Sequence, residues 1–219
     1  LIHAGKLLAV PGNAPVTNMT VIVEDDRITG VQDGFVEAEG ATVIDLRVTC
    51  VLPGVMDMHV HLQGELGPHK ERDALNMSDQ LMQMRSIHHA MNTLKAGFTT
   101  VRDVGSSSQE MYAMRDAINN CWIDGPRIMA AGGVGITGGH ADISCVSPDL
   151  MEIYTSANVC DGPYDCRRAA RNVIKYGADL VKITSTGGVM TERATGTGQQ
   201  MEADELREVV RAAERMGRK

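Results

Sequence analysis

The sequence lacks several features that mark common classes of protein. Aromatic residues make up only 3% of the 219 residues, which argues against a surface that stacks on nucleic-acid bases. Basic residues are the minority, with 21 Lys and Arg against 28 Asp and Glu, so the basic face of a nucleic-acid-binding protein is missing. No apolar run approaches the roughly 20 residues that span a bilayer. We therefore expect no nucleic acid and no membrane as partner.

The cysteine pattern also excludes some classes. The five cysteines form no CxxC pair, so a zinc knuckle is not expected. Their odd number and irregular spacing do not predict a disulfide framework, although Cys160 and Cys166 could pair within one loop. No signal peptide is recognisable, which leaves the bacterial cytoplasm and periplasm as candidate compartments.

The composition is that of a globular chain, with 43% hydrophobic and 22% charged residues. At roughly 100–200 residues per domain, the length corresponds to one domain or to one and a part. The 14 methionines are expected to fill much of the core that aromatic residues would otherwise occupy.

Residues 1–52 are predicted to form a small β layer without a helix. The apolar run 21–23 is followed by three acidic residues, 24–26, which have the turn chemistry of a hairpin. Residues 41–46 are rich in β-branched side chains and predict another strand.

From residue 53 onward, strand and helix patterns alternate. The expected strands are 55–61, 98–101, 127–131 and 179–184, and the expected helices are 78–96, one opened by a capping-box pattern at 107–110, 167–176 and 203–216. Such alternation predicts a parallel sheet in an α/β protein. Four units are present, whereas a closed (β/α)₈ barrel has eight and about 250 residues. The chain is therefore a small open sheet or the first half of a barrel, and the long segments after each strand favour the barrel.

The strongest chemical signal lies in residues 53–61, PGVMDMHVH. Side chains alternate along a strand, so Asp57, His59 and His61 share one face. Two imidazoles spaced in this way can hold one metal ion. The alternative is an incidental pair of half-buried histidines bonded to the backbone.

Lys182 stands inside the apolar strand pattern LVKI. Burial of an ammonium group is costly, and it favours the neutral amine, which can react with carbon dioxide. The resulting carbamate is an anionic ligand that can bridge two metal ions. Alternatively, Lys182 extends its charged end to solvent.

Two glycine-containing loops follow the third and fourth predicted strands. The first, 138–142, reads GGHAD, and its glycines allow the backbone to approach a ligand near His140. The second, 186–189, reads TGGV. Each loop either faces a substrate or is a simple solvent-exposed turn.

Taken together, His59, His61, Lys182 and the His140 loop resemble the metal-dependent amidohydrolase superfamily. The resemblance is to the branch of imidazolonepropionase-like enzymes and of Xaa-Pro and Xaa-Arg/Lys dipeptidases. It implies a (β/α)₈ TIM barrel with a small β-sandwich built from both ends of the chain. Residues 1–52 would belong to the sandwich, and 53–219 would form the first four β/α units of an incomplete barrel.

The resemblance also implies a binuclear centre with two divalent metal ions, in this case zinc. His59 and His61 would be metal ligands, and Lys182, carboxylated by carbon dioxide, would bridge both ions. His140 and Lys182 would be the catalytic residues of this half, with His140 facing the substrate, and Asp57 would support the ligands from behind.

The implied activity is zinc-dependent hydrolysis of an amide bond by a metal-bridging hydroxide. The enzyme would be a dipeptidase or carboxypeptidase that acts on a short peptide, releases a C-terminal Arg, Lys or Pro, and forms a homo-oligomer. Two alternatives remain. One is a mononuclear deaminase or an imidazolonepropionase-type cyclic amide hydrolase, in which Lys182 is not carboxylated. The other is a non-catalytic scaffold homologue.

Three functional residues of the superfamily have no counterpart in this sequence. They are a His after the fifth barrel strand, a His after the sixth and an Asp after the eighth. We therefore expect that this chain is a fragment or pairs with another chain, and that alone it neither closes a barrel nor turns over substrate.

Overall fold

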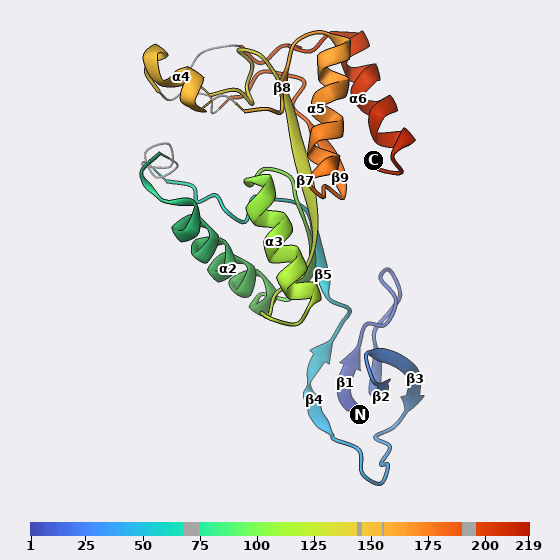
Figure 1. The fold of residues 1–219 in the computed structure, drawn as a ribbon. Helices are drawn as coiled ribbons and strands as arrows, with labels where there is room; N and C mark the ends of the chain where they lie inside the picture. The colour runs from blue at the N-terminus through green and yellow to red at the C-terminus, as the bar shows by residue number, and fades with distance from the viewer. Residues whose placement is uncertain (68–74, 144–145, 155, 190–195) are drawn as a thin grey trace. The chain divides into compact units, whose positions relative to one another are not determined.

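The computed structural model describes residues 1–67, 75–143, 146–154, 156–189 and 196–219. The chain divides into two compact units, Leu1–Gly54 and Val55–Lys219, and Figure 1 shows their elements. The described helices are too short or too polar to cross a membrane.

The first unit is a four-stranded sheet without a helix, as predicted. Its strands are β1 (Ile2–Leu7), β2 (Val16–Glu24), β3 (Arg27–Asp33) and β4 (Ile44–Val51), in the order β3-β2-β1-β4. The acidic stretch is the predicted hairpin turn between β2 and β3, and Asp25 adopts a φ of 53° there. The strand predicted at 41–46 begins later, at Ile44, because its hydrogen bonds are set by parallel pairing with β1.

The core of this unit is small. It consists of four buried apolar residues, Ala4, Leu7, Met19 and Val21. Thr20 is also buried, and its hydroxyl donates a hydrogen bond to the Gly34 carbonyl at 2.7 Å, which ties β2 to the end of β3. On β4, Val48 is 98% exposed, so no side chain of this unit packs over that position of the sheet.

The second unit contains a five-stranded parallel sheet, which confirms the predicted α/β class. Its strands are β5 (Val55–Val60), β6 (Phe98–Asp103), β7 (Arg127–Ile136), β8 (Val159–Cys160) and β9 (Leu180–Ile183). The sheet runs β5-β6-β7-β8, and β9 pairs with β7. All these pairings are parallel. This arrangement matches part of a barrel sheet.

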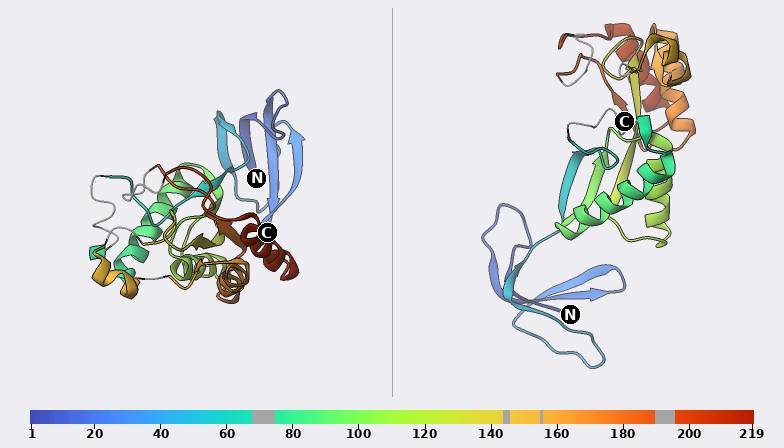
Figure 2. Two further views of the ribbon diagram at one scale, coloured as in Figure 1. Left: turned by 90° about the horizontal axis from the view of Figure 1, so that it is seen from above. Right: turned by 90° about the vertical axis from the view of Figure 1, so that its left-hand side faces the viewer.

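The helices of this unit are α2 (Asp79–Lys95), α3 (Ser108–Asn119), α4 (Pro148–Tyr154), α5 (Pro163–Lys175) and α6 (Ala203–Arg215). Most of the helices pack against strands of the parallel sheet, and α2 and α3 contact the strand that comes after them in the chain. Seen from above, α2, α3, α5 and α6 form an arc outside the strands (Figure 2). Ser78 caps α2 by accepting a hydrogen bond from the Leu81 amide at 3.3 Å. The predicted capping box of α3 does not form, since the Ser107 amide instead donates to the Gln63 side chain at 2.7 Å.

Strand β7 is longer than predicted. The sequence predicts a strand over 127–131 followed by a glycine-rich loop, but β7 continues to Ile136 through three glycines. A Cβ at Gly132 would overlap Val173 of α5, so the glycine allows the helix to lie directly on the strand. The extension is held by pairing with β9 and then β8, which are distant in sequence.

Methionine fills part of the core of the second unit, but less than expected, since Met56 and Met84 are 66% and 63% exposed. Met111, Met114 and Met201 are each 1% exposed.

Cys160 and Cys166 form a disulfide, the pairing that the sequence left open, whereas Cys50 and Cys121 are free. The chain turns back between β8 and the first turn of α5, so the Cα atoms of the bonded pair lie 4.9 Å apart.

Candidate active site

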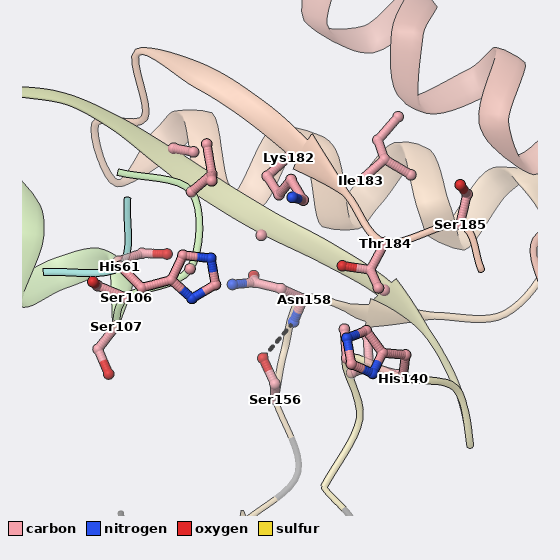
Figure 3. A pocket seen from close by; sticks show the side chains of 18 of the residues that line it. His61, Ser106, Ser107, His140, Ser156, Asn158, Lys182, Ile183, Thr184 and Ser185 are labelled. Carbon is pink, nitrogen blue, oxygen red and sulfur yellow. Dashed lines mark hydrogen bonds between the residues drawn. The ribbon is translucent and has the colours of Figure 1, made fainter. Parts of the chain in front are cut away.

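A pocket of about 980 Å³ lies where the parallel strands of the second unit end. Its walls come from the end of β5, the turn after β6, strand β7 and its following loop, the segment before β8, and the end of β9. Loops at the carboxyl ends of parallel strands form the active sites of α/β enzymes. The structure brings together four of the predicted residues in this lining: His59, His61, His140 and Lys182. Figure 3 shows the last three of them.

His59, in β5, and His61, directly after it, present nearly parallel imidazoles. Their ring centroids are 5.5 Å apart and the ring planes differ by 10°. This follows from strand alternation, which puts residues 59 and 61 on the same side. The ring of His61 packs against Gly105 in the turn after β6, where a Cβ would overlap the imidazole. Gly105 therefore provides the space for His61.

Partial burial lowers the pKa of His61 below its ordinary value. The positive charges of His59 and Lys182 act in the same direction, and the carboxylate of Asp103 opposes them. His61 is thus held toward the neutral imidazole, which is the form that binds metal ions.

Asp103 organises the turn that supports His61. The carboxylate is 2% exposed and accepts hydrogen bonds from the amides of Leu62 at 2.7 Å, Ser106 at 2.9 Å and Gly105 at 3.2 Å. It also accepts one from the Ser106 hydroxyl at 2.7 Å. A single buried carboxylate therefore connects the end of β5 to the turn after β6.

Lys182 is a half-buried residue of β9, and its side chain lies among the pocket-lining groups (Figure 3). In the parallel register it is paired with Gly133 of β7, which also lines the pocket. The absence of a side chain at Gly133 leaves space there, since a Cβ would meet nothing within 4 Å.

His140 lies in the loop after β7, on the other side of the pocket from His61 (Figure 3). Its amide donates to the Gln200 side chain at 2.9 Å. Its ring packs against Gly188, where a Cβ would overlap the imidazole. The two glycine-containing loops predicted from sequence therefore meet, and Thr186 and Gly187 of the second loop also line the pocket.

Asp57 lies outside the pocket lining. Its carboxylate accepts a hydrogen bond from the His59 amide at 3.0 Å, so it contacts the backbone of the histidine strand rather than an imidazole. Its supporting role toward the histidines stays a prediction.

Sequence reasoning missed several polar groups of the pocket. These are Ser106, Ser107 and Ser108 in the turn after β6, and Ser156 and Asn158 before β8. The three consecutive serines in the segment between a predicted strand and the next helix were a usable signal, because loops after strand ends carry active-site groups. The segment with Asn158 offered no such signal, since β8 has only two residues.

The chemistry of the pocket fits part of a metal site. Within the described residues, no three side chains of His, Cys, Asp or Glu form a group that could hold a metal ion. His59 and His61 supply two imidazole nitrogens, which zinc prefers as ligands. Lys182 would add a third donor only after conversion to an anionic carbamate.

Comparison with known proteins gives consistent matches. The sequence profile of the amidohydrolase family matches residues 50–219. Ochratoxinase from Aspergillus niger is 27% identical over 242 residues, which cover 100% of this chain and 48% of that protein. Dihydroorotase from Bacillus cytotoxicus is 35% identical over 124 residues, covering 54% of this chain and 25% of that protein.

Solved structures match along almost the whole chain. A Xaa-Pro dipeptidase with bound methionine in the active site superposes with a TM-score of 0.90 and 36% identity, covering 99% of this chain and 54% of that one. A prolidase complexed with N-methylphosphonate-L-proline has a TM-score of 0.81 and 29% identity, with the same coverage of 99% and 54%. The chain thus spans about half the length of the relatives that it matches.

Proposed function

Because this chain belongs to the amidohydrolase family, we propose that its pocket is part of the active site of a metal-dependent enzyme that hydrolyses amide bonds. The observation that carries the proposal is the convergence of His59, His61, His140 and Lys182 from three strand ends into one pocket. Dipeptidase and prolidase relatives support a finer proposal, a dipeptidase or carboxypeptidase that releases a C-terminal amino acid.

In this proposal His59, His61 and a carboxylated Lys182 would supply this chain's ligands to two zinc ions. Bound divalent ions supply a Lewis acid for the amide carbonyl and lower the pKa of a water molecule. The lowered pKa of His61 favours the neutral imidazole, which is the form that binds a metal ion, and Asp103 holds the adjacent turn.

The remaining side chains bind and orient the substrate. His140 lies across the pocket from His61 (Figure 3), and an imidazole N–H there would donate a hydrogen bond to an oxygen of the substrate. The hydroxyls after β6 and β9 add neutral donors and acceptors for a short peptide. The proton-transfer group expected from the family has no counterpart among these residues.

Two C-terminal side chains are candidates for the substrate. The names of the dipeptidase and prolidase relatives favour proline. The carboxylates of Asp79 and Glu110, which line the pocket, favour a basic residue such as Arg or Lys, because opposite charges attract across a partly enclosed site. A comparison of both substrate types decides between them.

The test uses the complete reading frame that encodes this chain, as wild type and as Lys182→Ala. Metal content per chain and hydrolysis of Xaa-Pro, Xaa-Arg and Xaa-Lys dipeptides are measured. We expect close to two zinc ions and turnover for the wild type, and a sharp fall of both in the variant. His88→Ala is the matched control, because His88 lies on α2 outside the pocket lining and contacts Asn92.

Other results would select the alternatives. One metal ion that is unaffected by Lys182→Ala would favour a mononuclear deaminase or an imidazolonepropionase-type enzyme. A folded protein without metal and without turnover would contradict both hydrolase proposals and favour the scaffold homologue.

A further inference from the structure

Residues 156–159 form one wall of the pocket. The wall includes Asn158, whose side-chain amide is hydrogen-bonded to helix α5. The Oδ1 atom of Asn158 accepts a hydrogen bond from Nδ2 of Asn172, on α5, at 2.9 Å. This leaves the Nδ2 group of Asn158, which can only donate, on the pocket side, extending toward the region of His61 (Figure 3). The wall therefore presents a hydrogen-bond donor of defined direction.

The backbone of this wall is held at several points. The Asn158 amide donates to the Ser156 hydroxyl at 3.2 Å, and the Asn158 carbonyl accepts from the Gly135 amide of β7 at 3.3 Å. From α5, the guanidinium of Arg168 donates to the carbonyls of Ala157 at 2.7 Å and Val159 at 3.3 Å. Side chains fixed in this way bind ligands at little cost in conformational entropy.

The disulfide adds a covalent connection between the same two elements. Cys160 directly follows the wall, and Cys166 belongs to the first turns of α5. Arg168 and Asn172 lie two and six residues further along that helix. Helix α5 therefore contacts both the backbone of the wall and the side-chain amide of Asn158.

We propose that Asn158 is a substrate-binding residue that donates a hydrogen bond from Nδ2 to the carbonyl oxygen of the amide that is cleaved, and that Asn172 is the residue that positions it. The proposal rests on the proposed amide hydrolysis. A carbonyl oxygen is the strong acceptor that every amide substrate shares, and a neutral amide donor suits it without requiring a charge on the substrate. Asn158 would thus face the reacting group, with His61 and Lys182 lining the same pocket.

Asn172→Asp provides the sharpest variant, because it keeps the shape of the side chain but can only accept a hydrogen bond. Asn158 would then turn its Nδ2 toward residue 172 and present its Oδ1 to the pocket, which converts the donor into an acceptor. We expect kcat/KM to fall about 10- to 100-fold, as for Asn158→Ala, with most of the loss in kcat. The double variant should lose no more than Asn158→Ala alone, because both changes remove the same interaction.

The experiment uses the full polypeptide with the dipeptide that the wild type cleaves fastest. Thermal unfolding and metal content are recorded for every variant. Asn13→Asp is the matched control, because it makes the same chemical change at an exposed residue of the first unit and should leave kcat/KM unchanged. Unchanged kcat/KM in Asn172→Asp, or losses that add in the double variant, would overturn the proposal.

A binding measurement separates this proposal from the proposed function. The Kd values of N-acetyl-L-proline and N-acetyl-L-arginine are measured by calorimetry for the wild type and for the Asn158 and Asn172 variants. If the wild type cleaves no amide but Asn158→Ala weakens binding tenfold, Asn158 stands as a binding residue and the hydrolase proposal fails. If the wild type cleaves dipeptides and the variants do so equally well, the hydrolase stands and the role of Asn158 is wrong. If the wild type neither binds nor cleaves these compounds, both proposals fail.

Discussion

The two sides of the pocket are built in different ways. On the β5 side, His59 near the end of the strand and His61 directly after it reach the pocket two residues apart, and the turn after β6 packs against His61. On the α5 side, Asn158 lies in a turn directly before β8, and its amide is hydrogen-bonded to a residue 14 positions further along the chain. The comparison shows that local strand geometry can place a candidate functional side chain, whereas the residues that support and orient such side chains come from distant parts of the sequence. Each prediction below tests one side against the other.

The largest effect is expected from Asp103→Ala on the β5 side. The substitution leaves three backbone amides and one hydroxyl without their buried acceptor. Since each unsatisfied buried donor costs about 1–3 kcal/mol, we expect the free energy of unfolding to fall by about 3 kcal/mol or more. Chemical denaturation measures this loss. Asp124→Ala, at an exposed position, is the control, and an equal loss in both variants would contradict the assigned role of Asp103.

Gly105→Ala should act more selectively on the same side. The new methyl group would overlap the ring of His61 and force it to move. Loss of ligand support commonly weakens metal binding by about 10- to 100-fold, and we expect a change of this size in a zinc titration. Gly64→Ala is the matched control, since its methyl group would make only ordinary contacts with His61. Equal zinc affinity in the two variants would show that Gly105 does not determine the placement of His61.

Removal of the disulfide tests the α5 side. The bond joins residues six positions apart. In the chain-entropy description, closing a loop of this size stabilises the folded protein by about 2 kcal/mol. We expect the Cys160→Ala/Cys166→Ala double variant to lose about this much unfolding free energy. We also expect a higher KM with zinc content unchanged, because the wall loosens while the β5 side stays intact. A loss of zinc would show that the two sides are not independent.

The smallest effect is expected from the ion pair between Asp165 and Arg168. The hydrogen bond from the Arg168 guanidinium holds the pKa of Asp165 below its ordinary value. A carboxylate with a lowered pKa stabilises the folded protein above its unfolded pKa, and this contribution is lost as the pH falls through the folded value. Because the pair is exposed, Asp165→Asn should cost less than about 1 kcal/mol at pH about 6. Denaturation at pH about 3 should then show a smaller difference from the wild type, and a larger one would contradict this assignment.

Much of the fold could be predicted from the sequence. The amino-terminal β layer, the alternation of strands and helices, the Ser78 cap and the parallel sheet follow from local patterns, and the structure confirms them. The amidohydrolase resemblance is confirmed by the family match over residues 50–219. The roles of His59, His61 and Lys182 as metal ligands stay predictions, although the structure brings the three residues into one pocket.

Other features could not be predicted because they depend on partners that are distant in sequence. The glycines of β7 have the composition of a loop, yet they form a strand because β9 pairs with them and α5 packs on Gly132. The capping box predicted at Ser107 does not form because the Ser107 amide donates its hydrogen bond to the Gln63 side chain instead. The Cys160–Cys166 bond forms because the chain reverses between β8 and α5.

The sequence by itself determined that His59 and His61 lie on one side, because residues two positions apart in an extended chain share a face. Asp57, which was expected on the same face, lies outside the pocket lining. The sequence also determined where helices and strands alternate, because hydrophobic periodicity is a local property. Only the tertiary structure decided that Gly105 makes room for His61, that Asp103 holds the turn beside it, and that Asn172 directs the amide of Asn158. Those contacts arise from close packing between segments far apart in the chain, which no local pattern encodes.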